Sequence, residues 1–248
     1  MTKFIFMLSP ALLSIALFNA GCAENPADNV PAAKVNAPDQ QSSKGPQNNP
    51  PHKGKGAPNN GSATNSSCKA DLKGDEKKLS GQIIFVGSKV TGNHVNEFSN
   101  WVGKATDTGV LSTTQLSFCV NTKDIVGDVD ATNPGNAKFE KKLRSKDFFD
   151  TRTHPTATFE STLLKRQPKG SATHEVTGNM TIKGITKSIT FPATINSING
   201  QFTMNAEFSI NRKDFNITYR GKTNDLIRDD VLLKLNFKGQ AFAPLEQP

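Results

Sequence analysis

The sequence has few of the residues that enzymes and metal centres require. Its 248 residues include four His, three Cys, one Trp and one Tyr. None of His94, His154 and His174 has another His, a Cys or a carboxylate at a metal-ligand spacing. Glycine-rich phosphate motifs are also missing, because Gly178 and Gly184 fall in an expected strand and hairpin. We therefore predict no catalytic site, no metal and no cofactor, and we interpret His174 as a core residue.

Positive charge is present but not concentrated. The formal net charge is +8, with Asp and Glu interleaved among the Lys and Arg residues. A nucleic-acid-binding protein would need a basic stripe, so we predict no nucleic-acid partner. The densest group of basic residues lies on the expected helix and the corner after it. Such a group is typical of a solvated helix face; the alternative is a surface that contacts anionic lipid head groups. This group comprises Lys138, Lys141, Lys142, Arg144 and Lys146.

The apolar stretch near the N-terminus is too short to cross a bilayer comfortably. Phe4–Phe18 spans about fifteen residues after Lys3, a pattern typical of an export signal. It closes on Asn19-Ala20-Gly21-Cys22, which resembles a bacterial lipobox, although Asn19 stands where Leu, Val or Ile is usual. We predict a signal peptide over 1–22 and a lipid anchor at Cys22, in an exported lipoprotein of the cell envelope, periplasmic or on the surface. In the alternative, cleavage leaves Cys22 as an ordinary thiol.

Residues 23–67 are rich in Asn, Pro, Ala, Ser, Gly and Lys and contain no aromatic residue. Such a segment cannot offset the entropy of ordering by burial. We predict a disordered tether over 23–67 and a folded domain over 68–248. A chain truncated before Cys68 is then expected to remain a folded β protein.

The body of the chain alternates apolar and polar residues with the period of half-buried strands. Two hairpin signals, Lys183-Gly184 and Asn199-Gly200, separate consecutive runs. A short amphipathic helix is expected from about Asn133-Pro134 to Arg144, followed by an apolar corner at Phe148-Phe149. The predicted strands cover 82–90, 98–107, 112–122, 156–165, 173–183, 188–195, 201–210 and 231–238.

We therefore predict an all-β fold, an eight-stranded antiparallel barrel with one short helix, because closure removes the exposed sheet edges. The expected inner rows are dominated by Phe, Ile, Leu and Val. An eight-stranded barrel can be filled by its own side chains or can hold one small ligand. The pattern alone permits both a packed interior and a cavity.

Three consecutive motifs, LRSKDFFD from Leu143, HPTATFEST from His154 and VTGNMTIKGITKSITFP from Val176, resemble the YceI-like family. The resemblance extends upstream to GSKVTGNH and downstream to FSINRKDFNI, and it covers about 79–242. Lys142 stands where the family often has His, and His154 replaces the usual Tyr before Pro155.

The resemblance implies a lipocalin-like barrel around an apolar tunnel that takes a polyisoprenoid, such as an isoprenoid quinone or a polyprenyl lipid. A dry apolar lining suits such a chain. The alternative function is that of a surface-tethered structural or interaction barrel with a packed interior and no ligand. The expected tunnel residues are Phe118, Phe159, Phe191, Met204, Phe208 and Leu235.

His94, Arg144 and Arg212 are the candidates for contact with a ligand head group at the barrel mouth. In the alternative, Arg144 and Arg212 bond Asp147 and Asp214 within their own corners.

Cys68 and Cys119 form a possible disulfide. If Cys22 is acylated they are the remaining thiols, and disulfides persist in exported proteins. Cys119 is expected on the outer face of its strand, but the sequence does not show whether Cys68 lies close to it.

Overall fold

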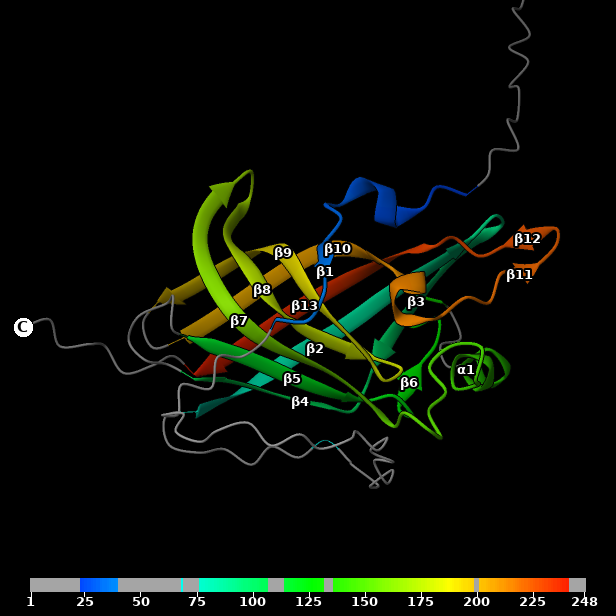
Figure 1. Cartoon of the computed structure of the whole chain (residues 1–248), viewed down its shortest axis with the longest axis horizontal. Coiled ribbons are helices and arrows are strands. Elements are labelled where there is room, and N and C mark those ends of the chain that lie inside the picture. Colours follow the sequence, from blue (N-terminus) through cyan, green and yellow to red (C-terminus); the bar gives the residue numbers. More distant parts are fainter. Residues whose placement is uncertain are drawn as a thin grey trace, which may run out of the picture.

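Eight antiparallel strands close into a barrel, as the alternating sequence predicts (Figure 1). The computed structural model describes residues 23–39, 68, 76–106, 114–131, 136–198 and 201–240. The last strand of the barrel pairs with the first one, with Leu233 opposite Phe85, and this pairing closes the sheet. In spatial order the barrel strands are β2 (Glu76–Lys89), β4 (Trp101–Thr106), β5 (Gln115–Asn121), β7 (Thr156–Lys169), β8 (Ala172–Ile182), β9 (Ile185–Ile198), β10 (Gln201–Asn211) and β13 (Asp230–Gln240).

The predicted alternation of the strands is confirmed. Along β10, Met204 and Phe208 are fully buried, whereas Asn205 and Glu207 are exposed. The hairpin between β8 and β9 has positive φ at both Lys183 and Gly184, as a type I′ turn requires. Asn199-Gly200, the other predicted hairpin, lies outside the described residues.

Short strands that the sequence did not predict extend one end of the barrel. They are β3 (Gly92–Phe98), β6 (Ile125–Val126), β11 (Gly221–Lys222) and β12 (Asp225–Leu226). The first barrel strand also begins at Glu76 rather than near residue 82. Gly81, with φ 130°, lies so close to β13 that a Cβ there would come 1.9 Å from the carbonyl oxygen of Asn236. A glycine is therefore required where β2 passes this strand.

The helix is shorter than predicted. α1 spans Ala137–Leu143, and Asn136 is its N-cap, with the side-chain Oδ1 accepting a hydrogen bond from Phe139 N at 3.1 Å. Asn133-Pro134, the predicted start, lies outside the described residues.

Residues 23–39, which we call the strap, are ordered against the barrel, and this corrects the prediction of a disordered tether in that part of the chain. The strap contains a 3₁₀ turn, η1 (Pro26–Asn29), and a strand, β1 (Lys34–Asn36). Ala27 is 3% exposed and belongs to a small cluster with Val86 and Leu232 on the outside of β2 and β13. Residues 40–67, the rest of the predicted tether, lie outside the described residues.

Main-chain hydrogen bonds explain why composition did not reveal the strap. β9 pairs with β10 only over residues 194–198, so the two strands separate beyond that point. The strap fills the gap: Ala33 N donates to Ser209 O at 2.8 Å, Ser209 N donates to Pro31 O at 3.0 Å, and β1 pairs with 188–190 of β9. This anchoring needs few apolar side chains, so a segment poor in them can still be ordered.

The possible disulfide is confirmed, since Cys68 and Cys119 are bonded with their Cα atoms 5.6 Å apart. The bond closes a loop across a sequence separation of 51 residues. We expect Cys119→Ser, made together with Cys68→Ser, to lower the free energy of unfolding by about 2–4 kcal/mol. Urea denaturation of the oxidised parent and the double variant measures the difference, and equal midpoints would contradict this expectation.

The buried His174 is expected to make the folded protein less stable in acid. Burial lowers the pKa of its imidazole below the ordinary 6.5, with the charge of Arg166 as a smaller cause. The unfolded chain therefore binds the proton more readily than the folded one, so stability is full above pH 6.5 and falls as the pH drops below it. We expect His174→Met to flatten this slope between about pH 5 and pH 7 in urea denaturation series. An unchanged slope would assign the acid sensitivity to other groups.

Candidate functional site

A cavity of about 360 Å³ opens at the end of the barrel that carries α1, β11 and β12. Its wall is mainly apolar and comes from the inner faces of β2, β5, β8 and β13, with the corner after α1 and the loop before β13 completing it. The volume falls in the range of pockets that hold small molecules. The principal apolar lining residues are Ile83, Phe85, Met180, Ile182, Val231 and Leu233.

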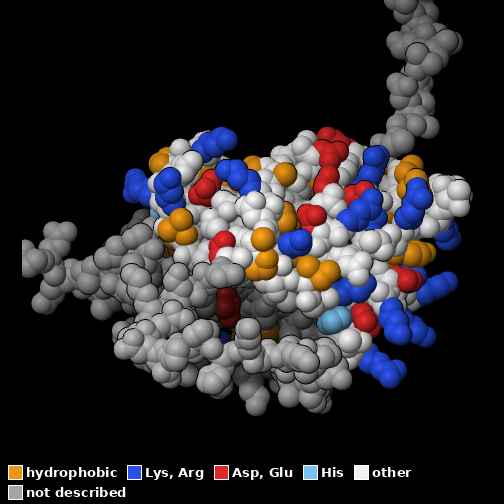
Figure 2. Space-filling model, viewed as in Figure 1, with side chains coloured by type: hydrophobic (Ala, Val, Ile, Leu, Met, Phe, Trp, Pro, Cys, Tyr) orange, Lys and Arg blue, Asp and Glu red, His pale blue; other side chains and the backbone are white. Residues whose placement is uncertain are grey.

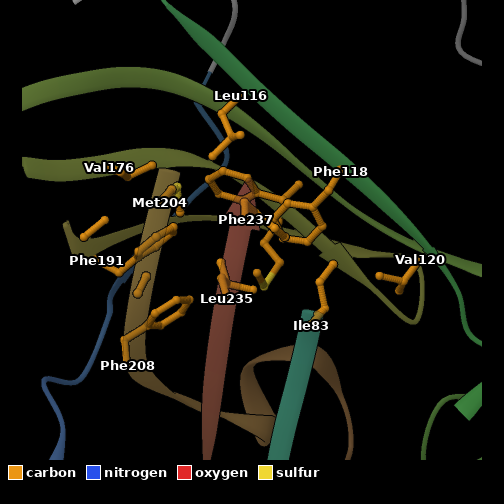
Figure 3. Close-up of a cluster of buried hydrophobic side chains, with 14 of the residues drawn as sticks. Ile83, Leu116, Phe118, Val120, Val176, Phe191, Met204, Phe208, Leu235 and Phe237 are labelled. Carbon is orange, nitrogen blue, oxygen red and sulfur yellow. The ribbon is translucent and has the colours of Figure 1, made fainter. Parts of the chain in front are cut away.

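The opposite half of the barrel interior is packed solid. The rings of Phe191 and Phe208 stack with their centroids 4.1 Å apart (Figure 3). The ring of Phe159 lies 5.6 Å from that of Phe191. Phe118 contacts Phe159 at 5.3 Å and also lines the cavity, so it stands at the boundary between the packed and hollow halves. The interior therefore combines the packed and the hollow arrangement that the sequence left open.

Two of the six predicted tunnel residues, Phe118 and Leu235, line this cavity. The others lie on the predicted inner face but outside the cavity lining, which corrects their placement. Each of them is at most 1% exposed, because they belong to the closely packed core of the barrel. These four residues are Phe159, Phe191, Met204 and Phe208.

The apolar corner after α1 covers one side of the cavity. Phe148 and Phe149 both line it. The ring of Phe149 meets those of Phe85 and Phe98 edge-on, each at 5.6 Å. The sequence identified this corner but did not show that it forms a cavity wall, because its partners come from β2 and β3, far away along the chain.

His94, a predicted head-group contact, lies at the cavity rim. Its Nδ1 is 2.6 Å from Asp128 Oδ1, and its ring stacks on Phe139 of α1 at 4.3 Å. Asp128 has φ 54°, so the backbone adopts a left-handed conformation where it presents this carboxylate. The pair fixes the imidazole in position between β3 and the helix.

Lys142, which stands at the position of the family's usual His, also lines the cavity. Its ammonium lies 3.8 Å from the ring centroid of Tyr219, a cation–π contact. A hydrogen bond to Asp147 raises the pKa of Lys142, with opposing desolvation next in importance. His154, the other departure from the family pattern, is not among the lining residues and packs on Gly184 instead.

The two arginines have mainly structural contacts. Arg212 lines the cavity but is 4% exposed, and it donates to the carbonyl oxygens of Ile217 and Arg228 and to Asp229. Its partner is Asp229, not the Asp214 of the alternative prediction. Burial lowers the pKa of this guanidinium from its usual value, and the charge of Asp229 opposes the shift.

Arg144 is not a lining residue, and this corrects its predicted place at the mouth. It donates to the carbonyl oxygens of Lys123 and Ile125 and pairs with Glu140 at 3.0 Å, rather than with Asp147. Its role is to fasten the corner to β6.

Two side chains that line the cavity, Ser88 and Asn96, each have a buried oxygen without a hydrogen-bond partner among the described residues. Asn96 is 1% exposed and its amide nitrogen donates to His94 O at 2.9 Å. Its Oδ1 is the atom without a partner. A buried acceptor without a partner costs free energy, so this oxygen is positioned to receive a hydrogen bond from a bound molecule.

Among the described residues, no group of three or more His, Cys, Asp and Glu side chains is placed to hold a metal ion. The described helices include none with the length and apolar character of a transmembrane segment.

Comparison with known proteins gives consistent family matches. A family model described as a YceI-like domain matches residues 70–239. A UPF0312 protein of Pseudomonas fluorescens is 29% identical over 178 residues, which cover 66% of this chain and 85% of that relative. A UPF0312 protein of Pseudomonas putida strain W619 is 34% identical over 102 residues, 39% of this chain and 52% of that relative. The chain thus spans about half the length of this relative.

Two solved structures share the fold. BcnA of Burkholderia cenocepacia has 23% sequence identity and a TM-score of 0.54, over 63% of this chain and 94% of that one. A polyisoprenoid binding domain from Saccharophagus degradans, implicated in plant cell wall breakdown, has 13% identity and a TM-score of 0.52, over 68% of this chain and 100% of that domain. At these identities the likeness concerns the fold.

Proposed function

The chain belongs to the YceI-like family, and from this membership we propose that its barrel binds a polyisoprenoid lipid, such as an isoprenoid quinone or a polyprenyl lipid. The observation that carries the proposal is the cavity, because its apolar wall and polar rim suit a molecule with a long hydrocarbon tail and one polar end. The name of the Saccharophagus degradans domain, which has the same fold, supports this ligand class.

The geometry favours entry of the tail first. The cavity ends at Phe118 and Leu235, beyond which the interior is packed, while His94 and Lys142 stand at its open end. A hydrocarbon tail against the apolar floor loses contact with water, and the polar end remains at the rim. The protein then sequesters or carries its ligand and does no chemistry on it.

Native mass spectrometry of protein purified from its own cells tests the proposal. We expect a bound species with the mass of an isoprenoid lipid, and uptake of added ubiquinone by protein stripped of lipid. A clean apo mass together with no uptake of ubiquinone or of a polyprenyl phosphate would support a barrel without a ligand.

We further propose that the protein is exported and anchored through acylated Cys22. The support is the export-signal pattern that ends at this residue, and two or more acyl chains suffice for stable anchoring. Cys22→Ala is expected to move the protein from the membrane fraction to the soluble fraction of its native host. Membrane retention equal to that of the parent would contradict the anchor and would leave the cavity's function open to its own test.

A further inference from the structure

The strap begins at the rim of the cavity. Ala23 N donates to Val90 O at 3.1 Å, and Asn93 donates from its side chain to Glu24 O at 3.2 Å. Val90 lies in the turn between β2 and β3, directly after Lys89, which lines the cavity. The residue that follows Cys22 is therefore held at the end of the barrel where the cavity opens.

The β11–β12 hairpin lies at this same end of the barrel (Figure 1). Val90 N donates to Leu226 O at 3.1 Å, and Lys89 pairs with Asp225 at 2.8 Å. Leu226 is 40% exposed, and the described chain has only one other large hydrophobic side chain as exposed, Leu163. A single exposed Leu is common on protein surfaces, but these contacts hold Leu226 at a defined position beside the cavity mouth.

Exposed cations lie at the same end of the barrel as Leu226. Arg220 and Arg228 flank the hairpin, and Lys138 and Lys141 project from α1 on the other side of the cavity mouth. None of the four forms an ion pair with another described residue. Figure 2 shows Lys and Arg side chains gathered at this end of the molecule. The end of the barrel at the cavity mouth thus combines one exposed apolar side chain, Leu226, with cationic side chains that have no ion-pair partner among the described residues.

We propose that this end of the barrel is a docking face for an anionic phospholipid bilayer. Leu226 enters the interfacial region, and Arg220, Arg228 and the α1 lysines contact anionic head groups. The cavity mouth then faces the bilayer, so a hydrocarbon tail passes between lipid and cavity with little exposure to water. This transfer role rests on the proposed function, whereas the docking itself does not.

The other end of the barrel supplies an internal control. Leu163, on the β7–β8 hairpin, is 47% exposed, and Lys165, Arg166 and Lys169 near it are also exposed. Its surface chemistry is therefore similar to that of the mouth end. The cavity mouth and the start of the strap lie only at the proposed face, and for this reason we assign docking to that end.

The test uses residues 22–248 with Cys22→Ser, so that no acyl chain contributes. Co-sedimentation is measured with vesicles of phosphatidylcholine containing about one third phosphatidylglycerol, and with phosphatidylcholine alone. We expect binding to the anionic vesicles that weakens as salt is added. Leu226→Asp combined with Arg220→Glu is expected to lower the partition coefficient at least tenfold, and Leu163→Asp combined with Lys165→Glu to leave it within twofold.

A second readout does not depend on destabilising substitutions. Leu226→Trp and Leu163→Trp are made separately, and their fluorescence is compared after subtraction of the Trp101 signal of the parent. We expect a blue shift on addition of anionic vesicles for the Leu226 variant alone. A shift at Leu163 alone, equal losses in both charge-reversal pairs, or no vesicle binding by the parent would overturn the docking face.

Uptake of ubiquinone from detergent solution is measured on the same proteins. None of the four substituted positions lines the cavity, so uptake is expected to be unchanged. Vesicle binding without uptake would contradict the proposed ligand and leave the docking face in place, whereas uptake without vesicle binding would do the reverse.

Discussion

Leu233→Trp is expected to lower the affinity for ubiquinone at least tenfold, which corresponds to a loss of about 1.4 kcal/mol in binding free energy. Leu233 lines the cavity on the inner face of β13, where it stands opposite Phe85 of β2 and Phe208 of β10. An indole at this position stays apolar but occupies space that the hydrocarbon tail needs. Affinity is measured by fluorescence titration and by the amount of co-purified lipid.

Lys234→Trp is the matched control for this experiment. Lys234 is the next residue of the same strand and points to the outer face, where it pairs with Glu207 at 3.4 Å. The same ring is added there without entering the cavity, so affinity is expected to stay within twofold of the parent. Equal affinity of both variants, with both folded by circular dichroism, would remove this cavity as the binding site.

Met204→Trp tests whether the ligand occupies only this cavity or a tunnel along the whole barrel. Met204 is fully buried in the packed half and does not line the cavity. A larger ring there overpacks the core, which typically costs about 1–3 kcal/mol of stability. Ligand affinity of the folded fraction is expected to change little. A strong loss of affinity without a loss of stability would instead indicate that the ligand reaches the far half.

The sequence was sufficient for the barrel but not for the extent of the cavity. Period-two alternation identifies the buried face of each strand, and for this reason the eight barrel strands and the inner rows were predicted correctly. Whether an inner row is packed or hollow depends on distances across the barrel. Phe191 and Phe208 stack at 4.1 Å, while Val231 and Leu233 face open space, yet all four belong to apolar rows of the same kind.

The rim was harder to predict because its contacts join distant segments. Asp128 bonds His94 and Asp229 bonds Arg212. Neither acid lies beside its partner in the sequence, and for this reason the predicted local partner of Arg212 was wrong. Arg144 does have a local partner, but it is Glu140, one helical turn before it, and not Asp147. The short strands that shape the mouth were missed for a related reason, since a two-residue strand such as β11 carries no detectable alternation.

The strap leads to the second large expected effect. A chain that begins at residue 40 is expected to lose about 2–4 kcal/mol of unfolding free energy relative to one that begins at residue 23. Removal of the strap exposes Val86 and Leu232 and leaves the separated edges of β9 and β10 without partners. This expectation replaces the sequence-based one, in which the whole segment before Cys68 was dispensable.

Two alanines of the strap provide a matched pair that leaves the chain length unchanged. Ala27 is 3% exposed against Val86 and Leu232, whereas Ala37 is exposed. Ala27→Arg forces a charge onto an apolar cluster or displaces the strap, so it is expected to approach the truncated chain in stability. Ala37→Arg is expected to stay close to the parent in stability.

Urea denaturation measures the stability of both variants, and hydrogen exchange follows the amide of Ser209, which donates to Pro31 O at 3.0 Å in the parent. If that amide were equally protected in the parent and the chain starting at residue 40, and their urea midpoints coincided, the strap would have no part in holding the barrel closed.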